Sequence, residues 1–282
     1  MVTTTAASRT YGSHPGPWAV AHRGGMGLAP ENTLLAFERA AGLGLTYLET
    51  DVRVTADGVP LAFHDRTLDR ITDLRGPVAS RTWAQISKAR VHGTEPVLPL
   101  EDLLGSFPDA CVSVDVKEAR AVRPLVATIR RTGAAGRVCV AGGWDGWLAA
   151  VSGACGPALT TALGWRALTA LVSAARTGVR PPRWIAGAAD FAHVGLAYGR
   201  LPVLEDPLIT ARLVGMADEL GIGVVAWTVD DAPTVHRLVD AGVAGVISDR
   251  PDVLREVLVA RDLWTPPHAR LFRPALREAA TR

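Results

Sequence analysis

The sequence has few cysteines, no long apolar run and almost no net charge. Its 282 residues include three cysteines, Cys111, Cys139 and Cys155, an odd number without the paired spacing of a disulfide framework or a cysteine metal site. No apolar run approaches the length of a membrane span, so stable membrane insertion is not expected. The net charge is +2, and no basic run suggests nucleic-acid binding. A charged substrate would therefore have to be bound by a local cluster of side chains.

The two ends of the chain have the composition of unstructured segments. Residues 1–16 are rich in Thr, Ala, Ser and Pro and lack the apolar core of a signal peptide, so they are predicted to be a disordered leader. The segment 265–282 carries several arginines and three prolines and is predicted to be a solvated tail. The globular part would then span residues 17–264. Without a targeting signal, the cytoplasm is the default location, and the oligomeric state is open.

Short apolar runs alternate with longer helical patterns along the globular part, which indicates βαβ units and a parallel sheet. Eight such units favour a closed (β/α)8 TIM barrel, an α/β fold, over an open doubly wound sheet. The open sheet stays possible because the sixth unit is poorly defined, although no glycine-rich dinucleotide fingerprint follows the first strand. Residues 65–99 interrupt the alternation and are predicted to be an insertion after the second strand. The predicted strands are 18–22, 47–55, 111–116, 137–141, 158–163, 191–196, 223–229 and 245–248, and the predicted helices are 30–41, 100–107, 122–132, 147–153, 167–177, 209–220, 232–241 and 252–263.

Two of the predicted strands carry ionisable residues at alternate positions. Glu49, Asp51 and Arg53 share one face of the second strand, and Asp115 and Lys117 share one face at the end of the third. The opposite faces are apolar and suit packing against outer helices, so the ionisable groups are expected inside the barrel, near the end where such enzymes keep their active sites. Three carboxylates can bind a hard cation such as Mg²⁺ or Ca²⁺. The alternative is that these carboxylates form structural ion pairs with Arg53 and Lys117.

Two histidines lie at the ends of predicted strands. His22 is followed by Arg23 and two glycines, which suits an anionic phosphate because a guanidinium can hold two oxygens and glycines allow close approach of the backbone. His64 precedes Asp65, which could orient its ring. Two imidazoles can divide the acid and base roles of a phosphate-ester cleavage between them.

Short characteristic segments occur from the first predicted strand to the last. They are AHRGG (21–25), PENTLLAF (30–37), ETDVRVTADGVPLAFHD (49–65), TLDRIT (67–72), LPLEDLL (98–104), VDVK (114–117), AWTVDD (226–231) and GVAGVISDRPDVL (242–254). By these segments the sequence resembles, over nearly the whole chain, the glycerophosphodiester phosphodiesterase family of the phospholipase C-like phosphodiesterase superfamily. The resemblance implies a TIM barrel that hydrolyses glycerophosphodiesters to an alcohol and sn-glycerol 3-phosphate, as part of lipid and glycerol metabolism.

The resemblance also implies roles for individual residues. Asp115 stands where the family more usually has glutamate, which is one methylene longer, so the third metal ligand departs from the family's pattern. The remaining matches are His22 and His64 as paired acid and base, Glu49 and Asp51 as metal ligands, Arg23 and Lys117 as phosphate-binding cations, Glu31 as an acid of the same pocket, and Trp227 as an aromatic beside the substrate.

Two other functions fit the same residues. A lysophospholipase D-like enzyme would act on lipid phosphodiesters, with Trp83 and Ile86 of the predicted insertion as an apolar surface for an acyl chain. A barrel that binds a phosphodiester without cleaving it is supported only by the departure at Asp115.

Overall fold

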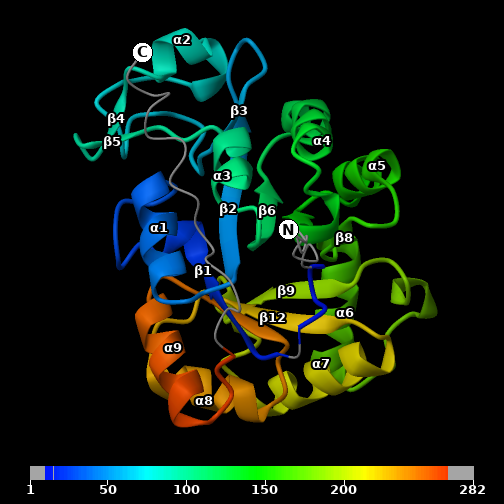
Figure 1. Cartoon of the computed structure of the whole chain (residues 1–282). Helices are drawn as coiled ribbons and strands as arrows, with labels where there is room; N and C mark the ends of the chain where they lie inside the picture. Colours follow the sequence, from blue (N-terminus) through cyan, green and yellow to red (C-terminus); the bar gives the residue numbers. More distant parts are fainter. Residues whose placement is uncertain (1–9, 15, 266–282) are drawn as a thin grey trace, which may run out of the picture.

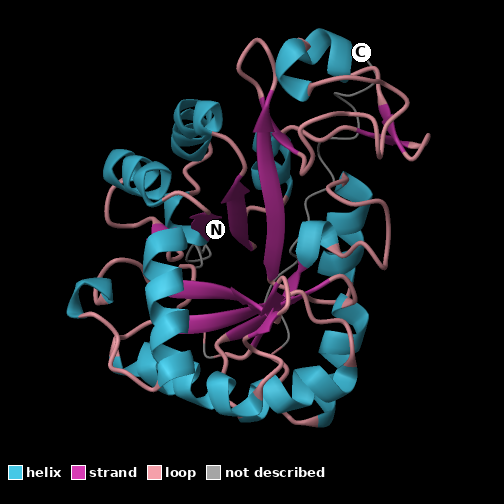
Figure 2. Ribbon diagram, turned by 180° about the vertical axis from the view of Figure 1, so that it is seen from behind, coloured by secondary structure: helices cyan, strands magenta, loops and turns pink. Residues whose placement is uncertain are grey.

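The structure is a computed structural model in which residues 10–14 and 16–265 are described. Within these residues, no helix is both long enough and apolar enough to cross a membrane. The central element is a ring of parallel strands, and the helices lie outside it (Figures 1 and 2).

Eight parallel strands form the barrel. Each strand pairs in parallel with its neighbours in the order β8-β7-β6-β2-β1-β13-β12-β9. A parallel bridge between Ala162 and Phe191 joins the two ends of this order and nearly closes the ring. The (β/α)8 fold predicted from the alternation of strands and helices is therefore confirmed. The strands are β1 (Trp18–Ala21), β2 (Tyr47–Val54), β6 (Cys111–Val116), β7 (Val138–Gly142), β8 (Thr160–Thr161), β9 (Phe191–Gly195), β12 (Gly223–Trp227) and β13 (Gly245–Ser248).

A helix follows each barrel strand and covers it with apolar side chains. The main apolar core lies between these helices and the outward faces of the strands, with residues such as Phe37, Leu103, Leu125 and Leu213 fully buried. The helices are α1 (Leu34–Gly42), α3 (Leu100–Ser106), α4 (Val122–Arg131), α5 (Asp145–Cys155), α6 (Trp165–Thr177), α7 (Pro207–Glu219), α8 (Ala232–Asp240) and α9 (Pro251–Ala260).

Several predicted elements differ from the observed ones in their bounds, and the largest differences are at α1 and β8. The first helix begins at Leu34 and not at Pro30, because the Thr33 side chain accepts a hydrogen bond from Ala36 N and caps the helix there, while Asn32 has a positive φ of 56°. The predicted strand 158–163 is reduced to Thr160–Thr161. The residues before the first helix are thereby free to form a loop at the end of β1.

The segment between β2 and α3 forms a small lobe beyond one end of the barrel, at the top of Figure 1. Strand β3 (Pro60–Ala62) pairs antiparallel with the end of β2, and α2 (Trp83–Ile86), β4 (Arg90–Val91) and β5 (Glu95–Pro96) follow. The lobe has an apolar core of its own, which includes Leu61, Phe63, Leu68, Ile71, Val78 and Ile86. Because the lobe begins at the carboxyl end of β2, it borders the end of the barrel where the predicted site residues lie.

The other end of the barrel is filled by aromatic side chains. Trp18, Tyr47 and Phe191 are the first residues of their strands, and the ring of Tyr11 packs against all three at centroid distances of 5.2–6.0 Å. The backbone N–H of Tyr11 also donates to the carbonyl of Gly136 over 2.8 Å. Tyr11, which lies within the predicted leader 1–16, therefore packs against the barrel. Residues 1–9, 15 and 266–282, which include most of the predicted leader and tail, lie outside the described residues.

Candidate active site

A cavity of about 340 Å³ opens at the carboxyl ends of the barrel strands. Strand alternation turns Glu49 and Asp51 of β2 and Asp115 of β6 into it, and β2 and β6 are paired so that Asp51 lies opposite Asp115. Eight of the nine predicted site residues line this cavity: His22, Arg23, Glu49, Asp51, His64, Asp115, Lys117 and Trp227. The ninth, Glu31, contacts the lining through Arg23.

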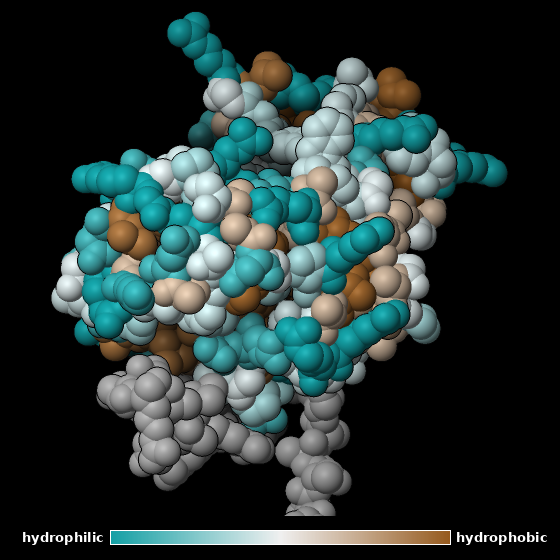
Figure 3. All heavy atoms as spheres, turned by 90° about the horizontal axis from the view of Figure 1, so that it is seen from above, coloured by the Kyte–Doolittle hydropathy of each residue, from teal (hydrophilic) through white to brown (hydrophobic). Residues whose placement is uncertain are grey.

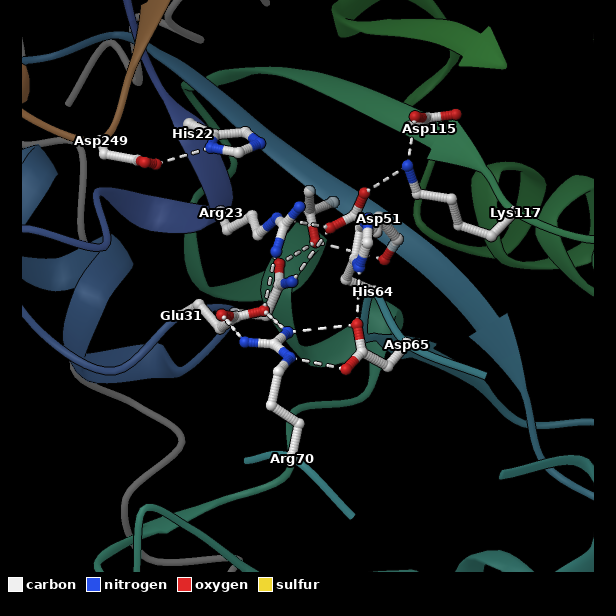
Figure 4. Close-up of polar contacts among 12 residues, drawn as sticks. His22, Arg23, Glu31, Asp51, His64, Asp65, Arg70, Asp115, Lys117 and Asp249 are labelled. Atoms are coloured by element: carbon white, nitrogen blue, oxygen red, sulfur yellow. Dashed lines mark hydrogen bonds and ion pairs between the residues drawn. The ribbon is translucent and has the colours of Figure 1, made fainter. Parts of the chain in front are cut away.

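His22 begins a short turn directly after β1 and is held by a carboxylate from the last strand (Figure 4). Its Nδ1 lies 2.6 Å from Oδ1 of Asp249, which follows β13. An ionised carboxylate only accepts hydrogen bonds, so Nδ1 carries the proton and Nε2 is left for chemistry. Burial alone would lower the pKa of His22, but the hydrogen bond to Asp249 and the charge of Glu49 outweigh it and raise that pKa.

The turn after His22 brings the backbone close to the acidic residues of β2. Arg23, Gly24 and Gly25 all have positive φ values, of 49°, 84° and 89°. A Cβ on Gly24 would lie only 2.8 Å from Cβ of Ala36, so only glycine fits there. In this conformation the backbone N–H of Arg23 donates to Oε2 of Glu49 over 2.9 Å.

His64 is held in the same way as His22. Its Nδ1 lies 2.7 Å from Oδ1 of Asp65, so its Nε2 is also left for chemistry. Arg70 of the lobe donates to both oxygens of Asp65 and, over 2.8 Å each, to both oxygens of Glu31. Glu31 in turn accepts from Arg23 Nη1 over 3.0 Å. Arg70 thus connects Asp65, the partner of His64, with Glu31, the partner of Arg23 (Figure 4).

Lys117 lies between two of the predicted metal ligands. Its Nζ is 2.9 Å from Oδ1 of Asp51 and 2.6 Å from Oδ2 of Asp115. The other oxygen of Asp51 is 3.1 Å from Nε of Arg23 and accepts from the Asn32 amide over 3.3 Å. Burial alone would raise the pKa of Asp51, but the charges of Lys117 and Arg23 outweigh it and lower that pKa.

Among the described residues, no lysine or arginine side chain forms an ion pair with Glu49. Burial, and then the negative charge of Asp51, raise the pKa of Glu49 to about 7. The site as a whole is acidic as well: with neutral imidazoles, six carboxylates face only three cations in this network. The carboxylates are Glu31, Glu49, Asp51, Asp65, Asp115 and Asp249, and the cations are Arg23, Arg70 and Lys117.

The donor chemistry of the site fits a hard divalent cation. Carboxylate oxygens are the ligands that Mg²⁺ and Ca²⁺ prefer, and bound positive charge would offset both the excess of carboxylates and the repulsion between Glu49 and Asp51. The side chains as placed hold one another, however: among the described residues, no three His, Cys, Asp or Glu are gathered to hold a metal ion. Lys117 and Arg23 contact the oxygens that a cation would share, so binding would require some of these contacts to be exchanged.

Several residues of the site were not predicted from the sequence. Asp249 is 227 residues from His22; it lies in the segment 242–254 that carries the family resemblance, but its role as the partner of His22 was not predicted. Arg70 lies within a quoted family segment, but nothing local indicates its two carboxylate partners. His193 of β9 also lines the cavity.

Comparison with known proteins identifies the family of this chain. The profile of the glycerophosphoryl diester phosphodiesterase family matches residues 22–253, so the chain belongs to this family. Among curated proteins, it is similar to the probable glycerophosphodiester phosphodiesterase 2 of Mycobacterium tuberculosis, with 36% identity over 253 residues that cover 89% of this chain and 94% of that protein. It is also similar to the glycerophosphodiester phosphodiesterase of Caldanaerobacter subterraneus, with 29% identity over 83% of this chain and 95% of that protein.

Solved structures share the fold. The structure of a protein named putative glycerophosphoryl diester phosphodiesterase, from Silicibacter pomeroyi, superposes with a TM-score of 0.69 at 24% identity, covering 89% of this chain and 96% of that one. A phosphodiesterase from Oleispira antarctica, solved with its product sn-glycerol 3-phosphate, gives a TM-score of 0.66 at 19% identity, covering 87% and 97%. At these identities the likeness establishes the barrel fold.

Proposed function

We propose that this protein hydrolyses glycerophosphodiesters to an alcohol and sn-glycerol 3-phosphate. The observation that carries the proposal is the pairing at the cavity: two histidines line it, and each is held at Nδ1 by a carboxylate, His22 by Asp249 and His64 by Asp65. Both Nε2 atoms are then available for proton transfer. The names of the two curated relatives and the product bound to the Oleispira enzyme support the same reaction.

The side chains divide the work of cleaving a P–O bond. One imidazole takes a proton from the nucleophile, a water or the neighbouring glycerol hydroxyl, and the other gives a proton to the leaving alcohol. Arg23 and Lys117 bring positive charge to the phosphoryl oxygens as negative charge develops on them. Asp249 and Asp65 orient the rings and stabilise their protonated forms.

Glu49, Asp51 and Asp115 are the residues that would hold a Mg²⁺ or Ca²⁺ ion. Such an ion, when bound, stabilises negative charge on phosphoryl oxygens. In this chain Lys117 contacts both Asp51 and Asp115.

The test of the histidines is to replace each by alanine and to follow release of sn-glycerol 3-phosphate from glycerophosphocholine. His22→Ala and His64→Ala should each lower kcat by about 10²–10⁴-fold, the usual contribution of one proton transfer. The matched control is His92→Asn, because His92 is an exposed histidine of the lobe and asparagine accepts its positive φ of 47°. Near-normal turnover by either alanine variant would refute the assigned pair.

Metal dependence has its own test. Turnover should stop after dialysis against a chelator and return with Mg²⁺ or Ca²⁺. Full turnover by enzyme shown to be free of metal would overturn the cation but leave the histidine pair standing. Binding of glycerophosphocholine without release of any product, with either ion, would instead favour a barrel that only binds phosphodiesters. The cytoplasmic location stays a prediction.

A further inference from the structure

Arg53 is an ionisable residue of the barrel that the proposed mechanism does not use. It lies near the carboxyl end of β2, after Glu49 and Asp51, and it is not among the described residues that line the cavity. Its Nη1 lies 3.7 Å from Oε2 of Glu118. Among the described residues, the ion pair that the sequence offered as an alternative, between Arg53 and the carboxylates of the site, is not formed.

The guanidinium of Arg53 binds the backbones of two residues of the site. Its Nε donates to the carbonyl oxygen of His64 over 2.9 Å, and its Nη1 donates to that of Lys117 over 3.1 Å. His64 follows β3 and Lys117 follows β6, and these strands pair with opposite edges of β2. A guanidinium is planar and rigid, which fixes the separation of its donors. Arg53 therefore determines how far apart the two segments lie.

Side chains continue the contact between β2 and β6 beyond the end of their backbone pairing. The paired residues end at Val52 and Val116. Past that point, Oε1 of Glu118 accepts a hydrogen bond from the backbone N–H of Val54 over 2.9 Å, while its Oε2 faces Arg53. Arg53 and Glu118 thus hold the two segments together where the sheet no longer does.

Arg53 is buried although it lies near a polar surface of the molecule. Hydrophilic side chains cover much of the face seen from above (Figure 3), but the side chain of Arg53 is only 9% exposed. A buried guanidinium loses its hydration, and an apolar side chain of similar size is often at least as favourable for stability. The two hydrogen bonds to backbone carbonyls of site residues therefore point to a role in the geometry of the site.

The lobe is a packed unit on one side of this contact. Ile86 is fully buried in the core of the lobe, and Trp83 packs against that core. The sequence offered these two residues as an apolar surface for an acyl chain, but their apolar area is used to fold the lobe. His64 lies where the chain passes from β3 into the lobe, so its position depends on how the lobe is attached to the barrel strands.

A second buried arginine has the same kind of contacts away from the site. Arg137 precedes β7 at the amino end of the barrel and is 4% exposed. Its guanidinium donates to the carbonyl oxygens of Leu104, Phe107 and Ala110 over 2.6–3.1 Å. None of these residues is among those described as lining the cavity. Arg137 thus matches Arg53 in burial and in bonding, but it contacts no residue of the site.

We propose that Arg53 is a positioning residue, which holds His64 and Lys117 at the separation that lets both reach one phosphodiester. The inference deepens the proposed function and rests on it. His64 gives or takes a proton at a substrate oxygen, and Lys117 faces the phosphoryl oxygens, so both must contact the same substrate at once. Arg53 itself contacts neither the substrate nor the transferred proton. A displacement of about 1 Å between the two segments would lower kcat by roughly 100-fold.

The first test compares substitutions of the two buried arginines in the full chain. The measurement is kcat, per folded molecule, for release of sn-glycerol 3-phosphate from glycerophosphocholine with Mg²⁺ or Ca²⁺ present. Arg53→Met should lower kcat by about 100-fold, whereas Arg137→Met should leave it within about twofold even if chemical denaturation shows a less stable protein. Arg53→Lys and Arg137→Lys repeat the comparison with less disturbance, and Arg53→Lys should still lose at least about tenfold, because an ammonium cannot make two paired contacts. Equal kcat values within each pair would overturn the inference.

A double-mutant cycle tests whether Arg53 acts through His64. Once the imidazole has been removed, its displacement no longer matters, so Arg53→Met should lower the kcat of His64→Ala by at most about tenfold, the part that acts through Lys117. A general loss of structure would lower kcat by the same factor in both backgrounds, and that result would overturn the inference while leaving the proposed function intact. No release of sn-glycerol 3-phosphate by the wild-type protein would refute the proposed function and the inference with it.

Discussion

At the scale of single residues, the site depends on side chains outside the cavity that position the side chains lining it. Arg70 binds both oxygens of Glu31 and both of Asp65, which are the partners of Arg23 and His64. Its guanidinium also lowers the pKa of Asp65 to about 2, so that carboxylate stays ionised across the working range. Arg70 does not line the cavity, and we regard it as a positioning residue.

Replacing Arg70 should therefore impair turnover more than stability. Arg70→Met should lower kcat by about 100-fold, the effect of a small displacement of catalytic groups. Arg70→Lys should recover little, because an ammonium cannot make two paired contacts. The control is Arg66→Met, an exposed arginine of the same lobe outside this network. Rescue of Arg70→Ala by added guanidinium would support positioning, and turnover of Arg70→Met within twofold of wild type would contradict it.

His193 makes a second prediction at this scale, on stability. Its pKa is about 4 when folded and near 6.5 when unfolded, so the unfolded chain binds more protons between these values and stability falls as pH drops through this window. His193→Gln removes this contribution. From pH 8 to pH 5, the wild type should lose about 2 kcal/mol more of its free energy of unfolding than His193→Gln, as measured by urea titration. Parallel losses in both proteins would show that the ring is not buried as a neutral group.

At the scale of elements, the tight turn after β1 determines where Arg23 lies. The strand delivers His22 to the rim, and three consecutive positive φ values fold the chain back so that the Arg23 backbone reaches Glu49. The turn was visible in the sequence as two glycines, but its contact with Ala36 of α1 was not. The sequence predicted that Pro30, Glu31 and Asn32 open the first helix. In the structure Asn32 lies outside the helix and forms hydrogen bonds with Asp51 and Thr50.

A methyl group on this turn should disturb both fold and function. Gly24→Ala combines a positive φ with a contact of 2.8 Å to the Ala36 side chain, and it should destabilise the protein by about 2 kcal/mol or more. Gly105→Ala is the matched control, since Gly105 lies in α3 with open space around it, and it should be neutral or stabilising by about 0.5–1 kcal/mol. Thermal unfolding and glycerophosphocholine turnover would measure both effects, and equal stability of the two variants would contradict the argument.

At the scale of the whole molecule, the barrel has one end for chemistry and one for stability. The carboxyl ends of the strands carry the ionised groups, while the amino ends meet in the aromatic cluster around Tyr11. Tyr11 is 5% exposed and its three aromatic partners come from β1, β2 and β9, so a segment outside the strands connects distant parts of the ring.

Removing the Tyr11 ring should therefore destabilise the fold, although Tyr11 lies far from the active site. Tyr11→Ala should lower the free energy of unfolding by about 3–5 kcal/mol, the usual cost of deleting a buried aromatic side chain. Thr10→Ala, at the neighbouring exposed position, should change it by less than about 0.5 kcal/mol. Chemical denaturation gives both values. A Tyr11→Ala protein as stable as the wild type would mean that the packing of Tyr11 against the strands does not stabilise the barrel.

The sequence by itself determined the parts of this protein that depend on local periodicity. Side chains alternate along a strand, so Glu49 and Asp51 share one face of the second barrel strand, and Asp115 and Lys117 share one face at the end of the third. The succession of strands and helices determines the barrel. The tertiary structure decided which of these groups meet. Asp249 reaches His22 only because the last strand pairs with the first, and the position of Lys117 between two carboxylates depends on the register of β2 and β6. Contacts of this kind follow from barrel closure, which no short stretch of the sequence specifies.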